Sequence, residues 1–195
     1  DTDGASNGIA SAFIKSLTLS GGDLYVVKTN NAIACSQTAG SASGCEFMVF
    51  DISDPANPTY VAGRDADGSS SGATSTNTFS IFVSGGYAYL GRFSNASACS
   101  QSAGSAAGCE LMIFDVSSST NPTYVAGRDA DGSSGGTGSL TVNSVYVSGN
   151  YAYIGKNGNS TACSQTAGSA TGCELMLFDV SSSTNPTYVA GRDAD

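Results

Sequence analysis

The chain contains no histidine and no tryptophan, and only 12% of its residues are charged. Histidine is the commonest general base and the commonest transition-metal ligand, so its absence disfavours hydrolases and zinc-dependent enzymes. We therefore expect a protein that is not an enzyme. Lysine and arginine number 7 against 16 acidic residues, which gives a net charge of −9 at pH 7. Such a surface disfavours binding to nucleic acid and anionic membranes, and no apolar run is long enough for membrane insertion.

The chain is dominated by an internal repeat. The segment ACSQTAGSASGCEFMVFDISDPANPTYVAGRDAD at 34–67 returns nearly unchanged at 98–131 and at 162–195, with a period of 64 residues. Repetition at this length is typical of an array of small units that bury their apolar faces only against a neighbour. We therefore divide the chain into units of one continuous array: repeat 1 (1–64), repeat 2 (65–128) and repeat 3 with the first residues of a fourth (129–195).

The chain begins without an initiator methionine or an apolar signal segment. It also starts and stops at the same phase of the repeat, at Asp1 and Asp193. We expect it to be a mature or excised piece of a longer array.

Each repeat predicts four short strands. An alternating apolar run, such as 14–19, leads through Gly-Gly or Gly-Asn into a second β-rich run, which is typical of a tight hairpin because these residues accept a positive φ. The third run (FMVFD at 47–51 in repeat 1) lacks alternation and predicts a strand buried on both faces. An Asn-Pro turn and TYVAGR complete the unit. The predicted fold is all-β, with three tandem four-stranded blade-like repeats in a β-propeller-like or open array.

These segments resemble a known repeat. Without its Cys-containing insertion of about 18 residues, each period has roughly 46 residues, near the size of a propeller blade. FMVFD, LMIFD and LMLFD, each followed by Ser, Asn-Pro and a short strand, are similar to the LVIVD-repeat family of secreted bacterial and archaeal β-propellers, as are the hairpin sequences YAYLG and YAYIG. The Cys segment departs from the family pattern. The resemblance implies a propeller-like fold and a surface location, and it implies no catalytic residues.

Every repeat carries two cysteines that bracket a polar stretch, SQTAGSASG in repeat 1. An even set that pairs locally predicts disulfides and hence secretion, whereas a structural zinc site needs four ligands. Six cysteines allow fifteen pairings, and their identical phase favours closure within each repeat. We interpret the bracketed stretch as a stapled, projecting loop. The predicted disulfides are Cys35 with Cys45, Cys99 with Cys109, and Cys163 with Cys173.

A recurring D-x-D-G motif is the candidate metal site. Carboxylates at alternate positions followed by Gly resemble the opening of a calcium loop, although the third acidic position and the distant Glu are missing. The alternative is an inter-blade turn in which Arg64, Arg128 or Arg192 pairs with neighbouring carboxylates. Ca²⁺ is the one cofactor that the sequence suggests. Its candidate ligands are Asp1, Asp3, Asp65, Asp67, Asp129, Asp131, Asp193 and Asp195.

Other polar and aromatic positions of the repeat are candidates for catalysis, sugar binding or glycosylation. Glu46 and Asp51 lie about 16 Å apart along an extended strand, too far for a glycosidase pair, so we expect the carboxylates to cap strands. The tyrosines of the YAY segments either stack on sugars or pack on one face of a sheet. Asn95 and Asn159 fit the N-glycosylation pattern.

Two functions remain open. Uniform repeats suit a polymer in which every copy makes the same contacts, and both terminal units would expose an apolar face. We therefore expect an extracellular structural protein that assembles with itself, head to tail, into a filament or cell-surface fibre, with closure of two or more chains into one larger propeller as the rival arrangement. The alternative is a secreted propeller that binds glycan or protein through its loops.

Overall fold

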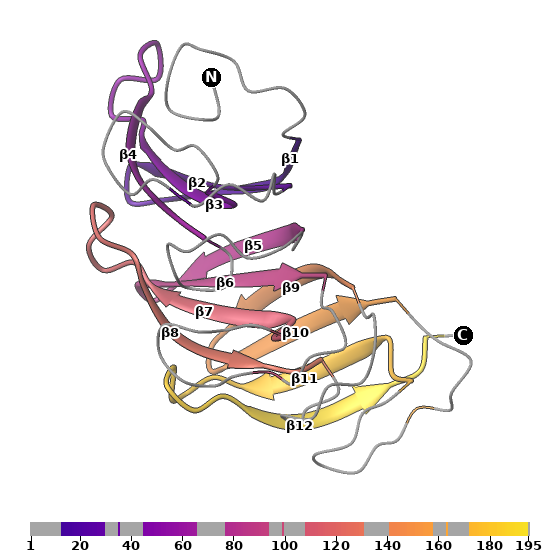
Figure 1. Ribbon diagram of the computed structural model, residues 1–195. Helices are drawn as coiled ribbons and strands as arrows, with labels where there is room; N and C mark the ends of the chain where they lie inside the picture. Colours follow the sequence, from indigo (N-terminus) through magenta and orange to yellow (C-terminus); the bar gives the residue numbers. More distant parts are fainter. Residues whose placement is uncertain are drawn as a thin grey trace.

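The computed structural model describes residues 13–29, 35, 45–65, 77–93, 99, 108–130, 141–157, 163 and 172–194. In these ranges the protein consists of twelve strands in three antiparallel sheets of four, and they contain no helix (Figure 1). The predicted all-β fold of three four-stranded repeats is confirmed.

Each sheet lies within one 64-residue repeat, and we call the sheets blades 1, 2 and 3. Their strands follow one another in sequence order across the sheet. Blade 1 contains β1 (Ile14–Ser20), β2 (Asp23–Lys28), β3 (Phe47–Asp51) and β4 (Thr59–Arg64). Blade 2 contains β5 (Thr78–Ser84), β6 (Tyr87–Arg92), β7 (Leu111–Asp115) and β8 (Thr123–Arg128). Blade 3 contains β9 (Val142–Ser148), β10 (Tyr151–Lys156), β11 (Leu175–Asp179) and β12 (Thr187–Arg192).

The first two strands of every blade form the predicted hairpin. Ser20 pairs with Asp23 across the turn, and both intervening glycines have positive φ, 64° at Gly21 and 96° at Gly22. Such a turn matches the right-handed twist of the flanking strands. Blade 3 keeps the same register around Gly149, with Ser148 opposite Tyr151.

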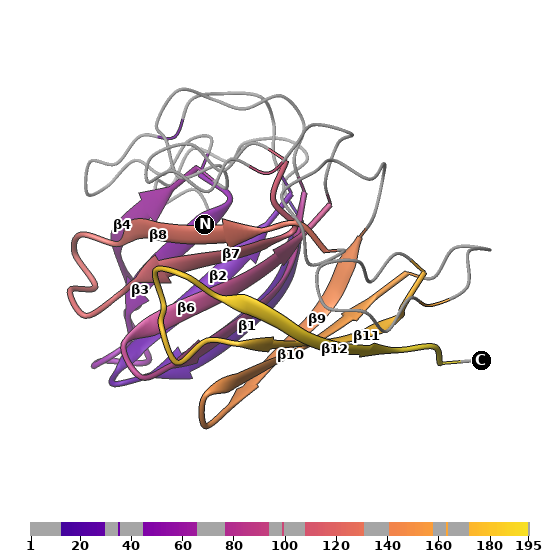
Figure 2. The same ribbon diagram turned by 90° about the horizontal axis from the view of Figure 1, so that it is seen from below.

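The blades are stacked in chain order, with β1 beside β5 and β5 beside β9 (Figure 1). Figure 2 looks at the stack from below and shows the sheets overlapping. Blades 1 and 3 lie at opposite ends, so the array is open rather than closed into a ring.

The core lies between blades. We call the face of a blade that turns toward the preceding blade its leading face, and the opposite one its trailing face. Phe47 on the trailing face of blade 1 contacts Phe114 on the leading face of blade 2, with ring centroids 5.2 Å apart. Tyr25, Val49, Met112 and Tyr124 are buried in the same cluster. A second cluster joins blade 2 to blade 3 in the same way.

Burial of the third strand confirms the prediction for two blades only. All but the last one or two residues of β3 and β7 are buried, whereas β11 buries Met176 and Phe178 but exposes Leu175. The difference lies in what covers the outer face of each strand. Met48 on the outer face of β3 is buried against Val26 and the Cys35–Cys45 disulfide, whereas Leu175 lies on the trailing face of β11, on which no described blade packs. The expectation that both faces of this strand are buried is therefore wrong for blade 3, where stacking rather than the strand sequence decides burial.

Candidate assembly interface

An arginine at the end of the fourth strand joins each of the first two blades to the next one. Arg64 Nη2 donates a hydrogen bond of 2.7 Å to Asn121 Oδ1, and Arg128 Nη2 donates one of 2.7 Å to Asn185 Oδ1. Arg128 Nε also donates to the carbonyl oxygen of Pro186. Both asparagines belong to the turn before the last strand of the following blade. We call this contact the Arg-turn latch.

The arginines of the latch are fixed on their own strands before they reach across. Arg64 Nη1 donates to Gly63 O at 2.6 Å, and Arg128 Nη1 donates to Gly127 O at 2.7 Å. Both side chains are buried, and this desolvation lowers the pKa of each guanidinium, although an arginine keeps its charge near neutral pH. A charged donor to a neutral acceptor contributes about 1.5–3 kcal/mol. The latch is thus an oriented, charged contact between blades.

The acceptor turns have the Asn-Pro geometry predicted from the sequence. The backbone N–H of Asn121 donates to Ser118 O at 3.1 Å, and Asn185 repeats this bond to Ser182 O. Pro122 and Pro186 are buried at the interface, whereas Pro58 is exposed in blade 1, the first blade of the described residues. Stacking therefore covers the turn as well as the apolar face.

The three predicted disulfides are present. They join Cys35 to Cys45, Cys99 to Cys109 and Cys163 to Cys173, each with a Cα–Cα distance of 4.3 Å. They indicate an oxidising environment. The described part of the chain contains no helix that is long and apolar enough to cross a membrane.

Each second cysteine packs against the glycine of TYVAGR. A Cβ atom added at Gly127 would lie 2.5 Å from Cys109 Sγ and 2.5 Å from Tyr124 Oη. Gly63 and Gly191 have the same surroundings. The disulfide, the tyrosine and the glycine thus form one tight layer next to the latch arginine.

The candidate calcium ligands fall mostly outside the described residues. Asp1, Asp3, Asp67, Asp131 and Asp195 lie there, as do the candidate glycosylation sites Asn95 and Asn159. Asp65 and Asp129 are buried at the ends of their blades, and Asp193 is exposed. Among the residues that the structure describes, no group of three or more side chains is arranged to hold a metal ion.

The aspartates that end the third strand of each blade cap it, as predicted. Asp51, Asp115 and Asp179 each accept a 2.8 Å bond from the backbone N–H two residues later. Hydrogen bonds from Ser53, Ser117 and Ser181 lower the pKa of these carboxyl groups. Glu110 and Glu174 accept from the backbone N–H of Ala130 and Ala194 and so tie the third strand to the segment after the fourth.

Sequence reasoning missed a buried cation at the end of the second strand of each blade. Lys28, Arg92 and Lys156 occupy the same phase of the repeat, and all three are buried. Arg92 Nε donates to Cys109 O, and the backbone N–H of each cation donates to the glutamate carbonyl at 2.9 Å. The signal was a basic residue at one phase of every repeat.

The two outer faces of the array expose residues whose equivalents are buried inside it. On the leading face of blade 1, Leu17 is 56% exposed, whereas Ile81 at the same phase of blade 2 is 5% exposed. On the trailing face of blade 3, Tyr153 is 40% exposed, whereas Tyr89 is 4% exposed. On the leading face of blade 1, Val26 and Met48 are nonetheless buried beside the Cys35–Cys45 disulfide. The exposed part of that face is therefore its β1 edge, whereas the trailing face of blade 3 exposes side chains of β10, β11 and β12.

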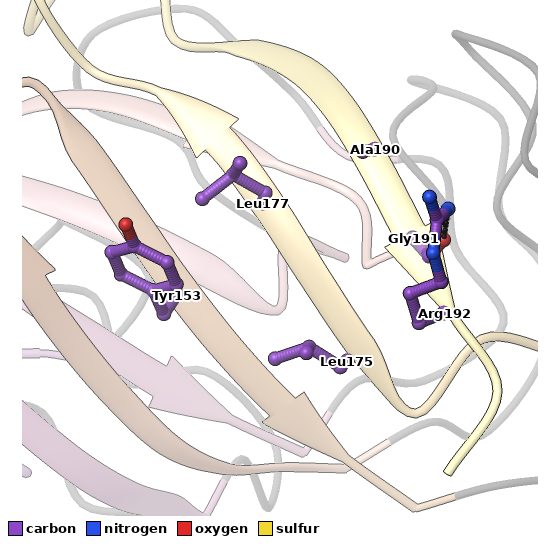
Figure 3. Close-up of a pocket in the computed structure, with 6 residues that line it drawn as sticks. All are labelled: Tyr153, Leu175, Leu177, Ala190, Gly191 and Arg192. Atoms are coloured by element: carbon purple, nitrogen blue, oxygen red, sulfur yellow. Dashed lines mark hydrogen bonds between the residues drawn. The ribbon is translucent and has the colours of Figure 1, made fainter.

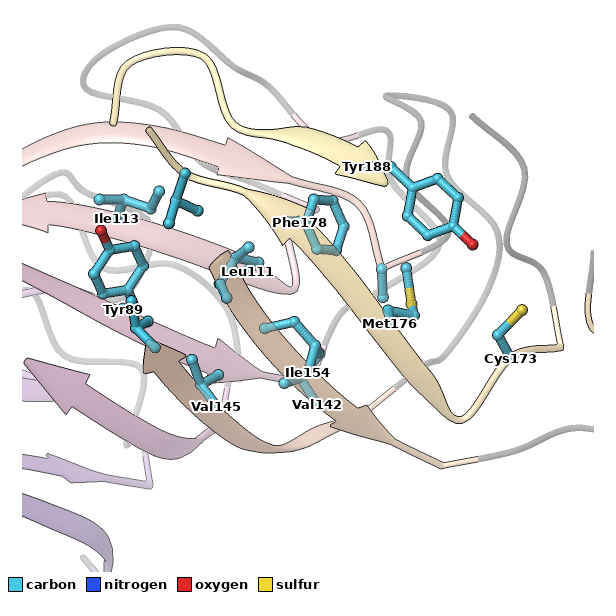
Figure 4. Close-up of a cluster of buried hydrophobic side chains, with 14 residues drawn as sticks. Tyr89, Leu111, Ile113, Val142, Val145, Ile154, Cys173, Met176, Phe178 and Tyr188 are labelled. Carbon is cyan, nitrogen blue, oxygen red and sulfur yellow. The ribbon is translucent and has the colours of Figure 1, made fainter. Parts of the chain in front are cut away.

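The trailing face of blade 3 is hollowed. A depression of about 210 Å³ is lined by Tyr153, Leu175, Leu177, Ala190, Gly191 and Arg192, and Figure 3 shows the first three side chains on β10 and β11 beside Arg192. Figure 4 shows the equivalent surface one blade earlier, where Tyr89, Leu111 and Ile113 lie in one cluster with Phe178 of blade 3. The trailing face of blade 3 thus corresponds to the trailing face of blade 2, on which blade 3 packs.

A second, polar depression of about 270 Å³ lies between the hairpin ends of blades 1 and 2. Ser20, Asp23, Tyr25, Ser117 and Ser119 contribute to its lining. Burial, followed by the neighbouring Asp23 carboxylate, raises the pKa of Tyr25. This depression offers hydroxyl and carboxylate groups to a polar ligand.

Comparison with protein families agrees with the strand sequences. The model of the LVIVD repeat matches residues 42–64, 76–96 and 141–161, which contain β3 and β4 of blade 1, the β5–β6 hairpin of blade 2 and the β9–β10 hairpin of blade 3. No curated protein matches the chain. The chain therefore carries the LVIVD repeat at three places, one in each of its three blades, as its strand sequences predicted.

Proposed function

We propose that this protein is an extracellular structural repeat protein whose copies assemble end to end into a filament or surface fibre. In this assembly the trailing face of one copy lies on the leading face of the next copy. One observation carries the proposal: each terminal face exposes apolar residues whose equivalents the array buries between its blades, such as Leu17 at the leading end and Tyr153 at the trailing end.

The apolar side chains at the two ends are large enough to drive association. Full burial of one such side chain contributes about 1.5–3 kcal/mol, and exposed apolar patches on a folded protein mark interaction surfaces. Because the two faces differ, the contact is head to tail, and such a contact grows into an open filament unless its rotation closes a ring. The leading face exposes Ile14, Leu17 and Leu19, and the trailing face exposes Tyr153, Leu175 and Val189.

The extracellular location is supported by the three disulfides, which persist in oxidising compartments. The proposal includes no catalytic activity, which agrees with the lack of histidine in the sequence.

Sedimentation velocity and electron microscopy of the purified chain over a range of concentrations test the proposal. We expect particles that lengthen with concentration and that show a regular axial repeat. Three-blade particles at every concentration would contradict self-assembly, and rings of one size would replace the filament by a closed propeller.

The polar depression between blades 1 and 2 favours the alternative of a binding module. Asp23 occurs there only in repeat 1, since repeats 2 and 3 have Tyr87 and Tyr151 at this phase. A hydroxyl-lined hollow with one carboxylate suits a sugar. Binding to a glycan array that Asp23→Ala abolishes would support this second function.

A further inference from the structure

The repeated latch suggests how two copies are fastened together. We propose that Arg192 of one copy donates to Asn57 in the turn of the next copy, and that Phe50 of that copy packs on Tyr153 and Leu175. This inference rests on the proposed end-to-end assembly and specifies its contact residues. The partner is a second copy of this chain, because the contact continues an interface that the chain already makes twice.

The two internal latches follow one register along the chain. Arg64 reaches Asn121 and Arg128 reaches Asn185, so each latch joins an arginine to the Asn-Pro turn of the next blade. Arg192 is the third arginine of this series, and Asn57 lies in the one Asn-Pro turn that neither of these bonds involves. A blade docked on blade 3 in the repeating geometry brings these two residues together.

The side chain of Arg192 is held on its own strand by the same hydrogen bond as the two internal arginines. Its Nη1 donates to Gly191 O at 2.7 Å, as the other two donate to Gly63 and Gly127. Arg192 is exposed on the trailing face, whereas Arg64 and Arg128 are buried beneath the following blade. Docking of a further blade would bury it in the same way.

The turn of blade 1 is adapted to receive a cation. Asn57 Nδ2 donates to Asp54 Oδ2 at 2.7 Å, so the amide oxygen is the atom that Asn57 offers to a donor. The equivalents of Asp54 in the internal turns are Ser118 and Ser182. The hydrogen bond from Asn57 lowers the pKa of Asp54, which is therefore ionised at neutral pH. The turn that would meet an arginine from another molecule is thus the one that carries a negative charge.

The apolar part of the contact is also preformed. Phe50 lies edge-on to Tyr60, with ring centroids 5.7 Å apart and an interplanar angle of 70°. The same pair in blade 2, Phe114 with Tyr124, is 5.6 Å apart at 71°, and it packs on Phe47 of blade 1. Leu175 occupies the phase of Phe47 on the trailing face of blade 3, so Phe50 of a second copy would meet it there.

Two single variants and their mixture test the latch. Loss of a charged hydrogen bond weakens a contact by about 10- to 100-fold, so Arg192→Ala and Asn57→Ala should each raise the concentration needed for assembly by that factor. Each variant retains one intact end. An equal mixture should therefore form dimers of six blades at the wild-type concentration and nothing longer, as measured by sedimentation velocity.

Arg128→Ala is the matched control, because it makes the same change at the same phase inside the array. It should lower the thermal unfolding midpoint and leave the assembly concentration of the folded chain unchanged. Circular dichroism checks that each variant is folded, which we expect because Asn57 and Arg192 are exposed.

The outcomes separate the inference from the proposed function. If the wild type assembles and both single variants assemble equally well, the latch is wrong and end-to-end assembly stands. If only Arg192→Ala has an effect, two trailing faces meet and the head-to-tail latch is overturned. If the wild type does not assemble at any concentration, the proposed function fails and this inference fails with it.

Discussion

At the scale of single residues, the uniform segment TYVAGR carries three separate tasks. Its tyrosine packs edge-on to the phenylalanine of the third strand, and burial raises the pKa of Tyr60 to about 12. Its glycine leaves room for the disulfide. Its arginine reaches the next blade. Each task fixes a different residue, which explains why one hexapeptide serves all three blades without change.

The glycine can be tested directly. Gly127→Ala would place a Cβ atom 2.5 Å from both Cys109 Sγ and Tyr124 Oη, in a layer with no space to relax. Overpacking of this kind costs about 1–3 kcal/mol, and we expect that loss in urea unfolding of the oxidised protein. Thr123→Ala, at an exposed position of the same strand, should change the free energy of unfolding by less than about 0.5 kcal/mol. A similar small loss for Gly127→Ala would show that the layer can move.

The aspartates that cap the third strands predict that the protein becomes less stable at low pH. Hydrogen bonds from Ser117 hold the pKa of Asp115 below its unfolded value near 3.9. A lowered folded pKa means that the stabilisation is complete above about pH 4 and is lost as the pH falls through the folded pKa. Urea midpoints measured from pH 6 down to pH 2 should therefore fall less steeply for Asp115→Asn than for the wild type. Equal slopes would show that the cap does not contribute.

At the scale of elements, the strands were predictable and the contacts between blades were not. Alternation, Gly-Gly turns and Asn-Pro turns are local signals, and they placed the hairpin and the third strand within a residue or so of their positions. The pairing of the cysteines was predicted from their identical positions within each repeat. The Arg-turn latch joins residues 57 positions apart, so it depends on how one sheet lies on another, which no local pattern encodes. The sequence offered a pairing of these arginines with neighbouring carboxylates as the alternative to a calcium site, and it gave no sign of their bond to the next blade.

Stacking rather than sequence decides the energetic role of the third strand. Leu111 and Leu175 are the same residue at the same phase, but Leu111 is 1% exposed and Leu175 is 47% exposed. Leu111→Ala should therefore cost about 2–5 kcal/mol in unfolding experiments on the unassembled chain. Leu175→Ala should cost less than about 1 kcal/mol under the same conditions. Equal losses would mean that the trailing face of blade 3 is covered.

At the scale of the whole molecule, the array has a direction, because its two end faces differ. Its leading and trailing faces differ in residues but fit one another, because the same pair of surfaces meets between blades 1 and 2 and again between blades 2 and 3. A propeller closes with about four to eight blades, so two copies with six blades could close a ring, whereas a small offset at each contact would produce a helix. The same contact residues serve the ring and the helix, and the rotation between neighbouring copies determines which of the two forms.

A capping variant distinguishes the filament from the ring. Leu175→Glu places a charge in the centre of the trailing face and leaves the leading face intact, so this variant can join one end of a growing filament but cannot extend it. Added to the wild type in increasing fractions, it should shorten the filaments seen by electron microscopy in proportion to its amount. A ring would respond differently, because complete rings would keep their size and only their number would fall. Asn150→Glu, which adds a charge in the exposed turn between β9 and β10, is the control and should leave the trailing face free to extend the filament.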